Sequence, residues 1–132
     1  MESGSAVMRE DMQERDGYAE AFLGAVEFRV DVAREGDAVR VSPVGEVDAA
    51  TIGRVREHVD EAMTTGTGRV ILDLRAITFL DSTALHLAVE THDWAARNGV
   101  VFAIIPGSPN VQRTFQVAQL TERLPFLDAP PA

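Results

Sequence analysis

The chain has 132 residues, of which 45% are hydrophobic, and this suffices for one buried core without metal ions or disulfides. It contains no Cys, which excludes disulfides, thiolate nucleophiles and cysteine-based zinc sites and is typical of a reducing compartment. The net charge of −9 disfavours binding to nucleic acid or to anionic membranes and favours partners with basic or mixed protein surfaces.

The start of the chain, residues 1–25, is polar and acidic and has no sustained periodicity, so we expect a flexible acidic N-terminal arm. It lacks the apolar core of a secretory signal, and no other stretch approaches the roughly 18 consecutive apolar residues of a membrane span. We therefore expect a cytoplasmic protein with one domain over residues 26–127 and a frayed tail over residues 128–132.

Two strands are expected next. Apolar and polar residues alternate over residues 26–32 and again over 38–44, which is the period of half-buried strands. Glu35-Gly36-Asp37 between them has turn chemistry, so the two strands should form an antiparallel hairpin. An amphipathic helix should follow, with apolar residues at the helical spacing of Ile52, Val55, Val59 and Met63. Asp48 or Thr51 is positioned to cap this helix.

The second half of the chain alternates strands with helices. Residues 69–74 are an apolar run typical of a central strand, and residues 77–80 suggest a short strand end. Asp81-Ser82-Thr83 then presents three successive helix-starting side chains, and a second helix should run to about Asn98, with Gly99 in the position of a left-handed C-cap. Residues 100–105 form an apolar strand. Ser108-Pro109 starts a third helix as N-cap and first-turn proline.

These elements predict an α/β fold in β-β-α-β-α-β-α order, with a mixed sheet of about four to five strands and helices packed against it. The expected inward strand residues are Val39, Val41, Val70, Leu72, Val101 and Ile104. The expected packing residues of the helices are Val55, Val59, Leu85, Val89, Val111 and Phe115.

The sequence gives little support for catalysis or metal binding. Ser82 follows a strand and opens a helix, but the Gly-x-Ser-x-Gly elbow of serine hydrolases is absent, and His86 one turn later is poorly placed to take the proton of a helix-capping hydroxyl. The three histidines, His58, His86 and His92, show no metal-binding spacing. Gly66-Thr67-Gly68 precedes a strand and lacks a Lys, so it is interpreted as a flexible turn and not as a phosphate loop. We expect no catalytic residue, no metal and no cofactor.

Asp81-Ser82-Thr83 allows two interpretations. Free backbone N–H groups at a helix start stabilise an anion, so a phosphate on Ser82 could be held there without unfolding the domain. Alternatively, Asp81 or Ser82 only caps the helix, and the spacing alone favours this second interpretation.

A resemblance favours the first interpretation. The segments Gly45-Glu46-Val47-Asp48, Val70 to Leu74, Phe79 to Leu85 and Ile105 to Phe115 resemble the STAS domain of bacterial anti-sigma factor antagonists, over residues 26–126. The resemblance implies a STAS-type fold and a partner switch, in which the unphosphorylated protein binds an anti-sigma factor that is also a serine kinase and so frees the sigma factor. It implies Ser82 as the phosphoserine, reset by a phosphatase. It further implies partner contacts by Glu46, Asp48, Asp81, Ser82 and Thr83.

One departure is that Ala84 stands where the family motif has glycine. Two rival functions stay open at this stage. A STAS scaffold, as in stress-sensing assemblies or transporter-associated domains, could be modified at Thr83 or not at all. A serine hydrolase is the remoter rival.

Overall fold

The computed structural model describes residues 27–65 and 68–128. The predicted arm, residues 129–132 of the predicted tail and residues 66–67 of the predicted turn lie outside these ranges. The elements in chain order are β2 (Arg29–Glu35), β3 (Ala38–Val47), α2 (Ile52–Thr64), β4 (Arg69–Asp73), β5 (Ile77–Leu80), α3 (Ser82–Asn98), β6 (Val101–Ile105) and α4 (Pro109–Val117). The predicted fold class is confirmed, and the short strand end at residues 77–80 is a strand of its own.

The first two strands form the predicted antiparallel hairpin. Their register runs from Arg29 opposite Val44 to Glu35 opposite Ala38. Gly36 in the turn has φ +64°, a left-handed conformation that glycine adopts without steric cost. The β2 strand therefore forms one edge of the sheet.

The sheet has five strands in the order β2-β3-β4-β6, with β5 paired to β3 outside this path. The long strand β3 pairs with two parallel strands, one along each half of its length. Its first half pairs with β4, from Ala38 opposite Arg69 to Val41 opposite Leu72. Its last residues pair with β5, where Val47 lies opposite Leu80. The carboxyl ends of β3 and β5 consequently meet at the same edge of the molecule.

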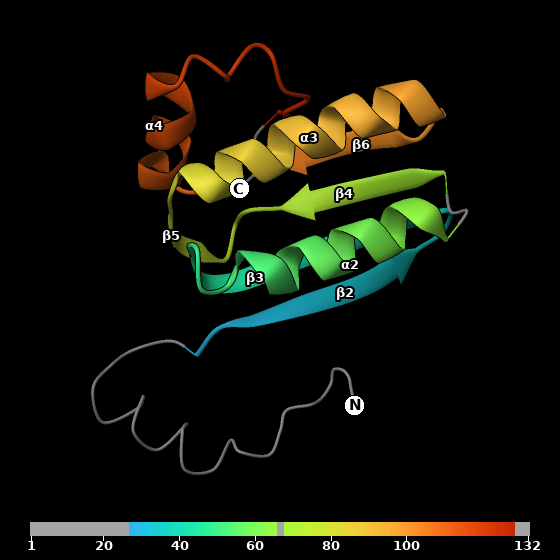
Figure 1. Ribbon diagram of the computed structural model, residues 1–132, viewed down its shortest axis with the longest axis horizontal. Helices are drawn as coiled ribbons and strands as arrows, with labels where there is room; N and C mark the ends of the chain where they lie inside the picture. The colour runs from blue at the N-terminus through green and yellow to red at the C-terminus, as the bar shows by residue number, and fades with distance from the viewer. Residues whose placement is uncertain (1–26, 66–67, 129–132) are drawn as a thin grey trace.

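The core lies between the sheet and two helices, α2 and α3, which cover the same face of the sheet (Figure 1). Most of the expected core residues are confirmed as buried: Val39, Val41, Val55, Val59, Val70, Leu72, Ile104, Val111 and Phe115. Leu85 and Val89 are only partly buried and pack against the rim of this core. Burying such aliphatic side chains stabilises the fold by about 1.5–3 kcal/mol each relative to leaving them exposed.

Val101 was expected to face the core, and this prediction is wrong. Its side chain is 55% exposed, whereas Phe102 is 7% exposed and Ile104 is fully buried. Successive side chains of a strand point to opposite faces, so Phe102 and Ile104 share the face under the helices and Val101 lies on the other face. Because β6 is a continuous apolar run, its sequence does not show which residues face the core.

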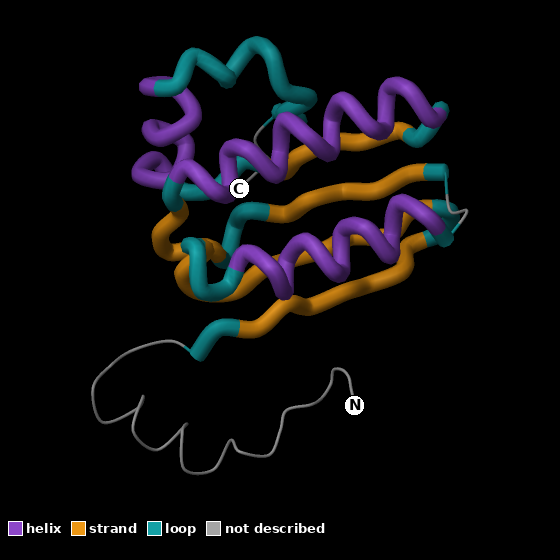
Figure 2. The backbone as a smooth tube through the Cα atoms, in the orientation of Figure 1, coloured by secondary structure: helices purple, strands orange, loops and turns teal. Residues whose placement is uncertain are grey.

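Helix ends follow the local sequence as predicted. The Ser108 hydroxyl accepts a hydrogen bond from the backbone N–H of Val111 at 3.3 Å, with Pro109 as the first residue of α4. Gly99 ends α3 with φ 71°. The segment after α4 is loop (Figure 2) and returns to β6, where Ile104 N–H donates to the carbonyl of Pro125 at 3.0 Å. This contact covers part of the second sheet edge.

Candidate functional site

Two polar segments meet where β3 and β5 end. The backbone N–H of Asp81 donates to the carbonyl of Val47 at 3.2 Å, which ties the residue after β5 to the last residue of β3. Asp48 follows Val47 directly, so the Gly45-Glu46-Val47-Asp48 segment and the start of α3 are neighbours in space although more than thirty positions separate them in sequence. The parallel pairing of β3 with β5 is what brings the predicted site residues together.

The start of α3 assigns different roles to its three cap candidates. The Asp81 carboxylate is the cap: its Oδ1 accepts hydrogen bonds from the backbone N–H of Thr83 at 2.9 Å and from the Thr83 hydroxyl at 2.6 Å. Ser82 is exposed, and its side chain has no hydrogen-bond partner among the residues that the structure describes. Ser82 is therefore dispensable for capping and accessible to another protein.

Asp81 is held in its ionised form. The hydrogen bond from the Thr83 hydroxyl, followed by that from the Thr83 backbone, lowers the pKa of Asp81 below its ordinary value. Both bonds favour the charged carboxylate because it only accepts. At neutral pH, the residue next to Ser82 thus carries a full negative charge.

Asp48 organises the turn that leads into α2. Its Oδ1 accepts from the backbone N–H groups of Ala50 at 3.0 Å and Thr51 at 3.3 Å. The Thr51 hydroxyl in turn donates to the carbonyl of Glu46 at 2.9 Å. The predicted capping role of Asp48 or Thr51 is thus realised as a bonded turn, with Thr51 in the N-cap position but making no side-chain cap bond. The Glu46 side chain is exposed.

Phe79 is an exposed aromatic residue beside these polar segments, and the sequence prediction did not single it out. Its side chain is 51% exposed, and its Cα partner across the β3–β5 pair is Glu46. An aromatic side chain exposed beside a polar cluster is typical of protein-binding surfaces. Only the first and last residues of β5 are buried, and no local pattern in the sequence shows that Phe79 is exposed.

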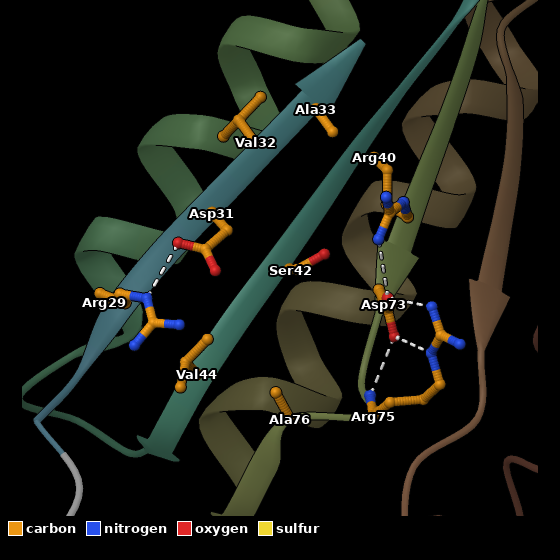
Figure 3. Close-up of a pocket in the computed structure, with 10 residues that line it drawn as sticks. All are labelled: Arg29, Asp31, Val32, Ala33, Arg40, Ser42, Val44, Asp73, Arg75 and Ala76. Carbon is orange, nitrogen blue, oxygen red and sulfur yellow. Dashed lines mark hydrogen bonds and ion pairs between the residues drawn. The ribbon is translucent and has the colours of Figure 1, made fainter. Parts of the chain in front are cut away.

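A second polar cluster lies on the face of the sheet that the helices do not cover (Figure 3). The side chain of Asp73 there is 6% exposed and accepts from Arg75 at 2.9 Å and from Arg40 at 3.4 Å. Burial alone would raise the pKa of Asp73, but the hydrogen bonds from Arg75 and Arg40 outweigh burial, and the net result is a lowered pKa. Arg40 also contacts Glu35 at 2.6 Å. This network braces β2, β3 and β4.

No group of three or more acidic or histidine side chains suited to a metal ion occurs within residues 27–65 and 68–128. None of the helices over the same ranges has the length and apolar character required to cross a membrane.

The five-stranded mixed sheet, with α2 and α3 on one face and Asp81 capping α3 directly before Ser82, defines a small α/β domain. The chain belongs to the STAS domain family, whose model matches residues 29–129. Solved structures agree. An anti-sigma factor antagonist from Mycobacterium paratuberculosis has a TM-score of 0.71 at 20% identity, covering 80% of this chain and 87% of that one.

Another similar structure is the anti-sigma factor antagonist SpoIIAA in its unphosphorylated form, with a TM-score of 0.64 at 20% identity, covering 79% of this chain and 89% of that one. The Bacillus protein SpoIIAA in its phosphorylated form has a TM-score of 0.59 at 19% identity, covering 79% and 92%. These likenesses establish a shared fold.

Proposed function

We propose that this protein is a cytoplasmic anti-sigma factor antagonist that binds an anti-sigma factor, itself a serine kinase, while Ser82 is unmodified. Binding frees the sigma factor. The kinase transfers the γ-phosphoryl group of ATP to Ser82 Oγ, the hydroxyl proton leaves and ADP is released; the phosphorylated protein then dissociates, and a phosphatase resets it. The observation that carries the proposal is the exposed, unbonded Ser82 hydroxyl directly after the cap of α3 in a STAS fold.

The hydrogen bonds at the helix start favour Ser82 over Thr83 as phosphoacceptor. The Thr83 hydroxyl is engaged with the Asp81 carboxylate at 2.6 Å. A phosphate on Thr83 would replace this bond by repulsion between two anions and remove the cap. A phosphate on Ser82 leaves the cap intact.

The surroundings of Ser82 suit a binding surface better than an active site. Glu46, Asp48 and Asp81 give it negative charge, which complements a basic partner surface, and Phe79 supplies an apolar contact. A serine hydrolase would need a base at the Ser82 hydroxyl, and none of the described side chains hydrogen-bonds to it. We therefore propose a binding function and no enzymatic one.

Replacement of Asp48 separates partner contact from turn formation. Asp48→Asn keeps an oxygen that accepts from the N–H groups of Ala50 and Thr51 but removes the charge. We expect Asp48→Asn to weaken partner binding about tenfold while the melting temperature stays within a few degrees, and Asp48→Ala to lose the turn bonds as well, at about 1 kcal/mol of stability. Calorimetric titration with the partner and thermal unfolding measure the two effects. If Asp48→Asn binds the partner with wild-type affinity, Asp48 contributes to the turn and not to partner binding.

Phe79 should be an anchor of the interface. Because its side chain is half exposed, we expect Phe79→Ala to cost less than about 1 kcal/mol of stability but at least tenfold in partner affinity. Val32→Ala is the matched control: Val32 is 50% exposed and lies opposite Val41, six residues before the end of β3. If both variants bind the partner equally well, Phe79 lies outside the interface.

Affinity capture tests the proposed function. Unmodified protein immobilised through its C-terminus should retain an ATP-binding protein from an extract of the source cells, and that protein should phosphorylate it. Native mass measurement of the captured material distinguishes a small kinase complex from the large assembly that a STAS scaffold would form. Retention of large self-assemblies without any kinase would favour the scaffold.

A further inference from the structure

His86 is the side chain best placed to meet a phosphate on Ser82. The two residues are one turn apart on α3, and side chains at i and i+4 lie on the same helical face. Helical side chains lean toward the N-terminus, so we expect the imidazole to extend toward the turn that carries Ser82. Both residues are exposed, and His86 makes no hydrogen bond or ion pair with any described residue.

The charged groups near this turn other than His86 are either already engaged or negatively charged, so they do not compete with His86 for a phosphate on Ser82. Asp81 is engaged in the cap, and Glu90, one turn beyond His86, is bound by Arg56 of α2 at 2.8 Å. The strand β6, which also packs against α3, contains only Val101-Phe102-Ala103-Ile104-Ile105 and so contributes no charge. Both arginines of α2 are engaged, Arg56 with Glu90 and Arg54 over the Phe28 ring at 4.9 Å, and the carboxylates here would repel a phosphate.

We infer that His86 is a phosphate-positioning residue, whose imidazolium pairs with a phosphomonoester on Ser82 and holds it along the outer face of α3. This inference rests on the proposed function for the identity of the modified residue. Phosphoserine loses its second proton near pH 6, and a cation beside it favours the dianion. The pair stabilises the dianionic phosphate and with it the switched-off form.

Phosphorus NMR of the full chain tests the pairing. Phosphoserine is installed at position 82 during translation, so that no kinase is needed. We expect the pH midpoint of the phosphate resonance to rise by about 0.3 pH unit in His86→Gln, and His86→Arg, which restores a cation, to return it toward the wild-type midpoint. His92→Gln, on a different face of the same helix, should leave the midpoint unchanged.

A second measurement uses the wild-type chain alone. Phosphorylation of Ser82 should displace the ring resonances of His86 in carbon–proton spectra and leave those of His58 and His92 in place. An unchanged midpoint in His86→Gln, or ring displacements equal in all three histidines, would overturn the pairing. Failure of the kinase to modify Ser82 would instead overturn the proposed function, because the installed phosphate reports the pairing independently.

Discussion

Phosphorylation of Ser82 is expected to weaken binding to the serine-kinase partner about a thousandfold without unfolding the domain. A phosphate adds about −1.5 to −2 charge at neutral pH to a protein whose net charge is already −9. In the free protein the start of α3 tolerates this charge. In the complex the phosphate would press against a surface shaped for a small hydroxyl, where desolvation and overlap cost about 4 kcal/mol.

Three variants test this expectation. Ser82→Ala should bind constitutively, because the hydroxyl makes no bond that the fold requires. Ser82→Asp should bind about ten- to a hundredfold more weakly, since one carboxylate imitates a phosphate dianion only in part. Thr83→Ser keeps the hydroxyl that donates to Asp81 and should behave as wild type. Titration calorimetry measures the affinities, and equal affinity of the phosphorylated and unmodified proteins would refute the switch.

Loss of Asp73 is expected to produce the largest change in stability. Its carboxylate is buried and accepts from the backbone N–H of Arg75 at 3.0 Å as well as from the side chains of Arg75 and Arg40. Asp73→Ala leaves that N–H without its acceptor and Arg40 without a partner on β4. The two guanidinium groups stay partly hydrated, so we expect a loss of about 2–3 kcal/mol, or roughly 10 °C in melting temperature.

The same residue predicts a pH dependence. The pKa of Asp73 is lower in the folded protein than in the unfolded chain, so the stability from its ionised form is complete above about pH 4. That stability is lost as the pH falls through the folded-state pKa. Urea unfolding of wild type and Asp73→Asn between pH 3 and pH 7 should show a shallower acid limb in the variant. Asp31→Asn, which removes an exposed ion pair with Arg29, serves as control, and equal limbs in all three proteins would contradict the role of Asp73.

The fold could be predicted from the sequence wherever local patterns determine the structure. Helical spacing placed α2, and Ser108-Pro109 and Gly99 marked helix ends that the structure confirms. The sequence pattern did not predict the faces of β6 correctly, because an uninterrupted apolar run does not show which face a residue such as Val101 lies on. The open face of the sheet became visible only in three dimensions.

The site was accessible only in part, because its assembly depends on long-range pairing. Three adjacent cap candidates could not be ranked from sequence, since all three side chains can accept from a helix N–H; the geometry selects Asp81. The proximity of Asp48 to Ser82 follows from the register of Val47 with Leu80, which no local pattern encodes. Phe79 was missed because a single exposed aromatic residue in a short strand has the same pattern as a buried one.

Mapping the phosphate after reaction with the captured kinase tests the central claim most directly. Trypsin cleaves after Arg75 and Arg97 and releases the peptide of residues 76–97, which contains Ser82, Thr83 and two further threonines. Tandem mass spectrometry then assigns the modified residue. The account predicts one phosphate, on Ser82, with loss of the partner as the modified fraction rises. Phosphate on Thr83, or complete modification of Ser82 with the partner still bound, would contradict it.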